Sequence, residues 1–201
     1  MIGLTGGIAS GKSSVMQHLK AKGAHIIDAD RIGHDVILPG GDAYPEVIAA
    51  FGRDIVAADK TIDRRKLGSI VFGSKEKLQT LNRISHPRMA ARMAQEIQAV
   101  RAKPAAERPP LIVLEAAILL EAGWDTLCDA VWAVEAPLEL STSRLMARNN
   151  LGLEQAQARM SAQITNEERA ARAHKVIKNS GSMDFLLAQV DLLWKEAAGR
   201  G

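Results

Sequence analysis

Gly6-Gly7-Ile8-Ala9-Ser10-Gly11-Lys12-Ser13 is the stretch that decides the fold. Its first glycine is followed five positions later by Gly11, and a lysine and a serine come directly after Gly11. Glycines let the backbone turn its N–H groups inward, and where a helix begins such groups form a nest for an anion. The lysine supplies charge for outer phosphates, and the serine hydroxyl can hold Mg²⁺. The stretch has the Walker A spacing and predicts a phosphate-binding loop.

The residues on either side of this loop supply the context that the motif requires. Residues 1–5 predict a strand, and residues 12–22 have the apolar spacing of an amphipathic helix that ends at Gly23. The alternative, a glycine-rich turn followed by Lys and Ser by chance, would not require a strand before it and a helix after it. Kinases, switch GTPases and motor ATPases share the loop, but the Asn-Lys-x-Asp motif by which GTPases recognise their base is absent from the chain.

Four further apolar runs predict strands at residues 24–27, 111–114, 130–134 and 175–177. The runs are continuous rather than alternating, as in parallel strands buried on both faces, and helical patterns separate them. We therefore expect an α/β fold of the P-loop NTPase type, with a parallel sheet of about five strands flanked by helices.

Two long helical stretches interrupt this alternation. One follows the second predicted strand and the other, rich in arginine and glutamine, follows the fourth. We expect a single domain with a core at 1–30, 105–143 and 173–201, a substrate-binding insertion at 31–104 and a helical lid at 144–172.

Composition narrows the function classes. Apolar residues make up 47% of the chain, charged residues 24% and aromatics 3%, and the net charge is +3. The charge suits small anionic substrates, while so few aromatics argue against a nucleic-acid binder that works by base stacking. The apolar run 111–120 contains Glu115 and is too short to span a bilayer. Cys128 is the only cysteine, which suits a reducing cytosol, so we expect a cytoplasmic protein. We also expect no nucleic-acid or membrane partner, and of the oligomeric states, which the sequence leaves open, we favour a monomer.

Asp28 and Asp30 stand at the end of the second predicted strand, where carboxyl ends of a doubly wound sheet face the ligand crevice. A carboxylate there can deprotonate an acceptor hydroxyl, or hold Mg²⁺ through water. Alternation along an extended segment would point both side chains the same way. The alternative is structural, with Asp30 capping a helix that starts near Arg31.

A series of motifs, taken in order, resembles those of the dephospho-coenzyme A kinases. They are the loop with its flanks at 1–14, Ile-Ile-Asp-Ala-Asp at 26–30, Arg64, Leu67, Val71-Phe72, Ile-Ser-His-Pro at 84–87, Leu-Leu-Glu-Ala-Gly-Trp at 119–124, Arg-Leu-Met-Ala-Arg at 144–148, Arg-Met-Ser-Ala-Gln at 159–163 and Ile-Lys-Asn-Ser-Gly at 177–181. The loop alone is generic, but the ordered set is specific. The resemblance implies ATP-dependent phosphorylation of the ribose 3′-hydroxyl of dephospho-coenzyme A, the last step of coenzyme A synthesis, with Mg²⁺ accompanying ATP.

The resemblance also implies roles for individual residues. Asp30 matches the base on the acceptor hydroxyl, and Lys12 and Arg148 match cations that act on the phosphates. By the same resemblance, Mg²⁺ is bound by Ser13 and Glu115. The acceptor is bound by Asp28, Asp30, Arg64, His86 and Pro87. The residues implied to bind ATP are Gly7, Ile8, Ala9, Ser10, Gly11, Lys12, Ser13, Ser14, Arg148 and Asn179.

The chain departs from the family pattern after its third predicted strand. The family has Asp, one residue and Pro there, whereas this chain has Glu115, Ala116 and Ala117. Two alternatives stay open: another small-molecule kinase with a nucleoside, nucleotide or shikimate-like acceptor, and a nucleotide-binding protein without transfer activity.

Some polar side chains have both a functional and a structural interpretation. Arg144, Arg159 and Arg169 can join Arg148 on the phosphates or lie on solvated helix faces. His86 precedes a proline, so we expect extended backbone there, with a cap or core histidine as the structural alternative.

Overall fold

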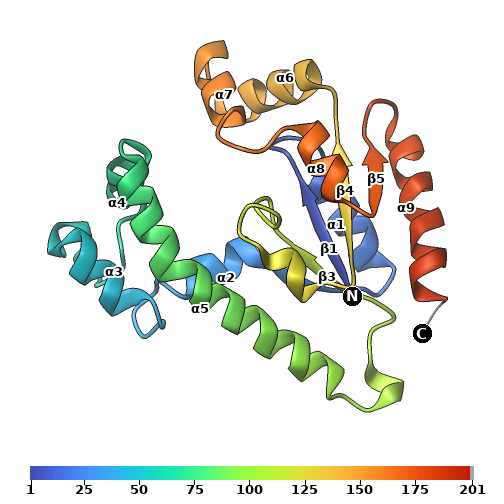
Figure 1. The fold of residues 1–201 in the computed structure, drawn as a ribbon, viewed down its shortest axis with the longest axis horizontal. Coiled ribbons are helices and arrows are strands. Elements are labelled where there is room, and N and C mark those ends of the chain that lie inside the picture. The colour runs from blue at the N-terminus through green and yellow to red at the C-terminus, as the bar shows by residue number, and fades with distance from the viewer. Residues whose placement is uncertain (200–201) are drawn as a thin grey trace. The chain divides into compact units, whose positions relative to one another are not determined.

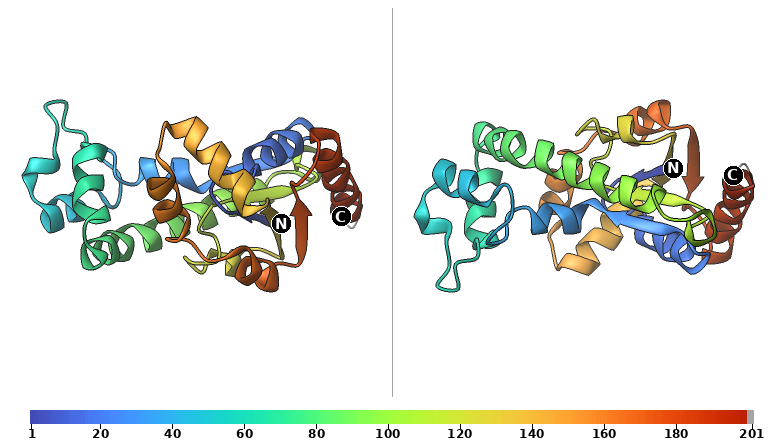
Figure 2. Two further views of the ribbon diagram at one scale, coloured as in Figure 1. Left: turned by 90° about the horizontal axis from the view of Figure 1, so that it is seen from above. Right: turned by 90° about the horizontal axis from the view of Figure 1, so that it is seen from below.

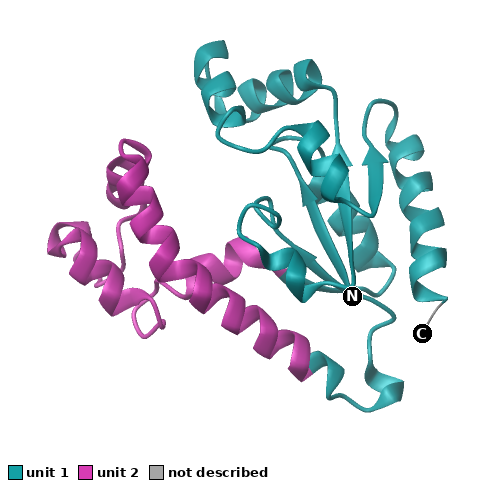
Figure 3. Cartoon of the chain, viewed as in Figure 1, with its two compact units in different colours: residues 1–27, 100–201 teal, residues 28–99 magenta. Residues whose placement is uncertain are grey.

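The computed structural model describes residues 1–199 and divides the chain into two compact units. The first contains residues 1–27 and the chain from residue 100 onward, and the second contains residues 28–99 (Figure 3). The predicted lid falls in the first unit, and so does the predicted core apart from residues 28–30. The second unit lies within the predicted insertion except for its first three residues, which belong to the segment that carries Asp28 and Asp30.

The first unit is built on a five-stranded sheet with the order β2-β3-β1-β4-β5. β1 lies in the middle and pairs in parallel with β3 on one side and β4 on the other, and β4 pairs in parallel with β5. All five predicted strands are confirmed, each with bounds within one residue of the prediction. The strands are β1 (Ile2–Gly6), β2 (His25–Asp28), β3 (Ile112–Glu115), β4 (Ala130–Glu135) and β5 (Lys175–Lys178).

Two helices, α1 (Lys12–Ala21) and α9 (Met183–Ala198), lie side by side and pack on the sheet (Figures 1 and 2). They bury one apolar cluster with alternate residues of the strands, which includes Leu4, Val15, Leu19, Trp132, Val134, Ile177, Leu186 and Val190. Burying a side chain of this size contributes roughly 1.5–3 kcal/mol. The Asp191 carboxylate of α9 also pairs with His18 of α1 over 2.7 Å and with Lys22, the C-cap of α1, over 2.8 Å.

The stretch after β4 is helical, as predicted. It forms α6 (Leu138–Asn149), α7 (Leu153–Met160) and α8 (Asn166–Arg172), and α8 packs against β4 (Figure 1). Short 3-10 turns, η2 (Ala105–Glu107) and η3 (Trp124–Leu127), flank β3. Cys128 is half-buried, and burial raises the pKa of its thiol to about 12, which disfavours the thiolate form.

The second unit is helical, which also agrees with the sequence. It contains α2 (Ala29–Asp35), α3 (Tyr44–Phe51), η1 (Arg53–Ile55), α4 (Arg64–Phe72) and most of α5 (Lys75–Arg101). Among its buried apolar side chains are Ile32, Val47, Ile55, Leu67 and Met93. None of the described helices combines the length and the apolar content needed to cross a membrane.

Candidate active site

The phosphate loop joins the carboxyl end of β1 to the first turn of α1. Ala9 and Gly11 have positive φ values of 60° and 95°, and the Ser10 N–H donates to the carbonyl oxygen of Gly7 over 3.1 Å. A backbone path that mixes left-handed and right-handed residues in this way is typical of an anion nest. No acidic residue occupies the first turn of α1, so the helix dipole adds to the attraction for an anion.

Asn179, directly after β5, supports this loop from behind. Its side chain is buried, and its Nδ2 donates a 2.8 Å hydrogen bond to the carbonyl oxygen of Ser10. Its own backbone N–H donates to the Glu135 carbonyl oxygen over 2.7 Å, which ties it to the end of β4. A Cβ at Gly11 would stand 2.0 Å from the same Nδ2. Glycine is therefore required at position 11 both for its φ and for this close approach.

Lys12 and Glu115 form an ion pair at the carboxyl ends of neighbouring strands. Lys12 is the first residue of α1, and Glu115 is the last residue of β3, in register with Leu4 of β1. Both side chains are largely buried, 14% and 8% exposed. The glutamate that departs from the family pattern thus reaches the lysine of the phosphate loop.

The structure corrects the expected geometry of Asp28 and Asp30. Helix α2 begins at Ala29 instead of near Arg31, and its N-cap is Asp28, whose Oδ1 accepts from the Arg31 N–H over 3.0 Å. Asp30 lies in the first turn of the helix and is exposed, so the two carboxylates do not alternate along one extended segment. The capping role belongs to Asp28, and the capping alternative for Asp30 was wrong.

Arg64 begins α4 and lines a pocket within the second unit. The Asp63 side chain caps this helix by accepting from the N–H groups of Arg65 and Lys66, and the Lys66 bond in particular lowers the pKa of the Asp63 carboxyl. The pocket has a volume of about 370 Å³, and its wall includes His34 and Ile37 of the α2 region as well as Arg64. Arg64 and His34 therefore line the same pocket, although they are 30 positions apart in the sequence.

The expectation of extended backbone at His86 was wrong. α5 continues through His86 and Pro87 without a break, even though proline removes one hydrogen bond and costs about 3 kcal/mol in a helix interior. This turn of the helix buries Ile84 and Met89, and such packing outweighs the local preference. His86 is half-buried, and burial lowers its pKa; Pro87 is exposed.

A cavity of about 510 Å³ lies within the first unit, bordered by the phosphate loop and by α6, α7 and α8. Gly7, Ile8 and Ser10 contribute from the loop, and Gln163 and Arg169 are among the residues on the opposite wall. The Ile8 N–H donates to Gln163 Oε1 over 2.9 Å. The motif at 159–163 ends with Gln163, but the sequence assigned this residue no individual role, because no local pattern marks a side chain that binds a backbone group 155 residues away.

The four arginines predicted for the lid have different surroundings. Arg148, at the end of α6, is exposed, donates from Nε to Asn149 Oδ1 over 2.9 Å, and is not among the residues lining this cavity. Arg159 is exposed and Arg144 is half-buried. Arg169, in contrast, is 2% exposed and lines the cavity, so the solvated-face alternative was wrong for Arg169.

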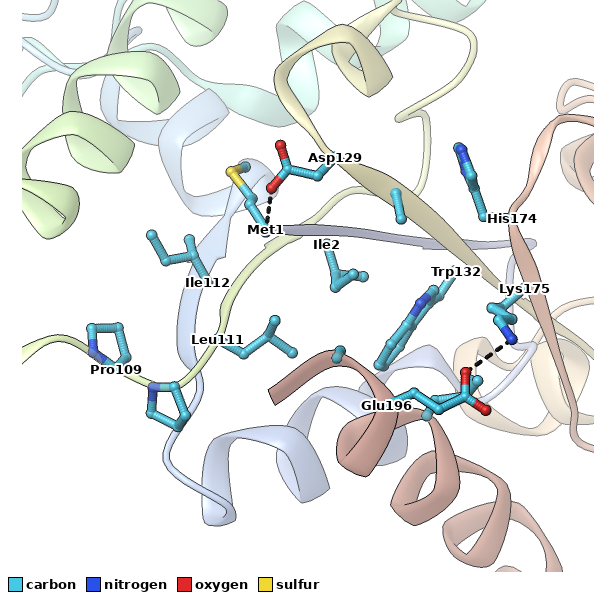
Figure 4. Close-up of a pocket in the computed structure, with 14 residues that line it drawn as sticks. Met1, Ile2, Pro109, Leu111, Ile112, Asp129, Trp132, His174, Lys175 and Glu196 are labelled. Carbon is cyan, nitrogen blue, oxygen red and sulfur yellow. Dashed lines mark hydrogen bonds and ion pairs between the residues drawn. The ribbon is translucent and has the colours of Figure 1, made fainter. Parts of the chain in front are cut away.

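A second cavity in the first unit, of about 720 Å³, lies at the other end of the strands. Figure 4 shows Met1, Ile112 and Trp132 around it, near the starts of β1, β3 and β4. Its charged groups bind one another: the Met1 ammonium pairs with Asp129 over 2.6 Å, and Lys175 pairs with Glu196 over 3.0 Å. Parallel α/β sheets bind ligands at the carboxyl ends of their strands, where the phosphate loop lies.

Comparisons with known proteins agree with this arrangement. The sequence model of the dephospho-CoA kinase family matches residues 1–184. The dephospho-CoA kinase of Carboxydothermus hydrogenoformans is 45% identical over 94% of this chain and 90% of its own length. Among solved structures, one from Thermus thermophilus has a TM-score of 0.80 at 32% identity, covering 97% of this chain and 96% of that one. The dephospho-CoA kinase from Campylobacter jejuni has a TM-score of 0.72 at 30% identity, covering 100% and 98%. The chain belongs to the dephospho-CoA kinase family.

Proposed function

We infer that the chain is a dephospho-CoA kinase, which transfers the γ-phosphoryl group of ATP to the ribose 3′-hydroxyl of dephospho-coenzyme A in the last step of coenzyme A synthesis. The observation that carries this inference is the extent of the family match, which takes in the phosphate loop and the whole of the second unit. A phosphate loop alone would support only nucleotide binding, since many unrelated activities share it.

ATP enters the reaction as its magnesium complex, held by residues 7–14. The Lys12 ammonium neutralises charge that moves with the phosphoryl group. Ser13 and Glu115 are the candidate Mg²⁺ ligands. Within residues 1–199, no three His, Cys, Asp or Glu side chains form a group that could hold a metal ion. Mg²⁺ fits this set, because it is usually bound through one or two protein oxygens with phosphate oxygens and waters as the other ligands.

Asp30 is the base of the proposed reaction. Its carboxylate takes the proton of the 3′-hydroxyl as that oxygen bonds to the γ-phosphorus and the bond from the phosphorus to the ADP oxygen breaks. Asp28 uses its carboxylate as a helix cap, whereas Asp30 is exposed, which supports the choice of Asp30. We propose that the acceptor is bound by Asp28, Arg64, His86 and Pro87.

Arg148 is proposed to contribute a cation to the ATP phosphates from the lid, and Asn179 to contribute on the adenine side while it supports the loop. We further propose that the protein acts in the cytoplasm as a monomer, with no nucleic acid or membrane as partner. These assignments follow from the family resemblance and the composition. Mutation tests the roles of Arg148 and Asn179, and sedimentation analysis tests the monomeric state.

A coupled ADP-release assay with dephospho-coenzyme A, followed by mass analysis of the product, tests the proposed function. We expect acceptor-dependent ADP release and a product heavier by one phosphoryl group. Adenosine, shikimate and gluconate serve as competing acceptors. Faster turnover of one of these would assign the chain to another small-molecule kinase. ATP binding without release of ADP on any acceptor would make it a nucleotide-binding protein.

A further inference from the structure

The hydrogen bond from the Ile8 N–H to Gln163 Oε1 links two segments that are far apart in the sequence. Ile8 belongs to the phosphate loop, and Gln163 belongs to the connection between α7 and α8. The bond is 2.9 Å long and partly buried. Together with the bond from Asn179 to the Ser10 carbonyl oxygen, it holds the peptide groups of the loop from outside at two points.

Arg169 holds the segment that carries Gln163. Its Nη2 donates to the Ile164 carbonyl oxygen over 3.2 Å and lies 3.7 Å from the Glu121 carboxylate, and its Nη1 lies 3.4 Å from Asn166 Oδ1. Asn166 in turn donates to the Ala136 carbonyl oxygen over 3.1 Å, just beyond β4. The connection between α7 and α8 is thus held by two side chains of α8: Arg169 binds its Ile164 carbonyl oxygen, and Asn166 ties the start of α8 to the residue after β4.

The Arg169 side chain is almost completely buried, with 2% of it exposed. Burial lowers the pKa of the guanidinium, and the Glu121 charge opposes that shift. A Cβ at Gly7 would stand 3.6 Å from Arg169 Nη1, so the guanidinium approaches the loop at a residue without a side chain. Among residues 1–199, the buried side-chain atoms without a hydrogen-bond partner are Arg169 Nε and Ser10 Oγ, and both residues line the 510 Å³ cavity.

We propose that Gln163 is a positioning residue for phosphoryl transfer: its amide oxygen holds the Ile8 N–H and with it the shape of the phosphate loop, while Arg169 holds Gln163. The proposed effect is on the binding of ATP and not on the binding of the acceptor. A loop whose peptide groups are already oriented binds the phosphates without having to reorganise. This inference rests on the proposed function for its kinetic part and on the structure alone for the conformation of the loop.

Two substitutions of similar length separate the hydrogen bond from the shape of the side chain. Gln163→Met removes the acceptor oxygen, and Gln163→Glu keeps an acceptor but adds a negative charge near the phosphates. We expect Gln163→Met to lower kcat/KM for ATP by about 3- to 10-fold, the effect of one hydrogen bond, with KM for dephospho-coenzyme A unchanged. Gln163→Glu should lose more at low salt and recover as salt screens the added charge. Gln155→Met, on the exposed surface of α7, is the control.

Amide hydrogen exchange at Ile8, measured by NMR on the full chain without nucleotide, tests the contact without reference to catalysis. Exchange should accelerate in Gln163→Met, and in Arg169→Lys, which keeps the charge but loses the planar fork. It should stay slow in Gln163→Glu and Gln155→Met. Unchanged Ile8 exchange and unchanged kcat/KM for ATP in Gln163→Met would overturn the proposal. If wild-type protein fails to phosphorylate dephospho-coenzyme A, the exchange results and calorimetric ATP binding still decide whether Gln163 positions the loop.

Discussion

The Nδ2 of Asn179 donates a buried hydrogen bond of 2.8 Å to the carbonyl oxygen of Ser10, so the residue after β5 supports the loop after β1. Asn179→Asp replaces this donor with a carboxylate oxygen facing a carbonyl oxygen. We expect a loss of about 2 kcal/mol in the free energy of unfolding, the penalty for an unsatisfied buried group, and at least a tenfold rise in KM for ATP. Urea unfolding and ADP-release kinetics measure the two effects. Equal free energies of unfolding and equal KM values for ATP in wild type and variant would show that this hydrogen bond does not support the loop.

Gly11→Ala tests whether the loop needs glycine at this position. The new Cβ would meet Asn179 Nδ2 at 2.0 Å, on a residue with φ of +95°. We expect calorimetry to detect no ATP binding. Gly152→Ala is the matched control, because no atom lies within 4 Å of its Cβ position and its φ of −71° suits alanine. If Gly11→Ala binds ATP as well as Gly152→Ala does, the loop is not the phosphate site.

Lys12→Met separates catalysis from stability. The change removes the charge that neutralises the phosphoryl group and leaves the largely buried Glu115 without its ion pair. We expect kcat/KM to fall by more than tenfold, over ~1.4 kcal/mol, and the free energy of unfolding to fall by about 3 kcal/mol. The double variant Lys12→Met with Glu115→Gln should recover stability but not activity. Recovery of both would assign Lys12 a structural role only.

Asp30→Asn and Asp28→Asn distinguish the base from the cap. Asparagine cannot take the hydroxyl proton, so Asp30→Asn should lose kcat by roughly 10²–10⁴-fold while both substrates still bind. Asp28→Asn should keep its stability, because asparagine is an equally good N-cap, whereas Asp28→Ala should lose about 1 kcal/mol. Steady-state kinetics and thermal unfolding provide the readouts. A normal kcat in Asp30→Asn together with an inactive Asp28→Asn would exchange the two roles.

The Asp191 carboxylate gives the packing of α1 and α9 a pH dependence. Hydrogen bonds from Lys22 and then His18 lower its pKa below the ordinary value. A lowered folded-state pKa stabilises the fold above the unfolded-state pKa, about 4, and this contribution is lost as the pH falls through the folded-state pKa. Asp191→Asn should therefore be less stable than wild type at pH 7, and the difference should shrink below pH 4. A difference in urea midpoint that does not change with pH would contradict the assignment.

Much of the fold follows from short stretches of sequence. The strands were predictable because each is a continuous apolar run, which is what a strand buried on both faces requires. The phosphate loop was predictable because the spacing of its glycines, lysine and serine acts locally. The family followed from the order of several such motifs along the chain.

Other features depend on contacts that local sequence does not record. Asp28 and Asp30 are two residues apart, and which of them caps α2 depends on where the helix begins. His86 and Pro87 predict extended backbone, but the burial of Ile84 and Met89 keeps α5 continuous.

By itself, the sequence determined the parallel sheet, the phosphate loop and the family, because these depend on neighbouring residues and on the order of motifs. Only the tertiary structure decided that Gln163 binds the Ile8 N–H and that Arg169 is buried beside Gly7. The physical reason is that a hydrogen bond across 155 residues, or the desolvation of a guanidinium within a polar helix, depends on how distant segments pack, and no local periodicity marks either one.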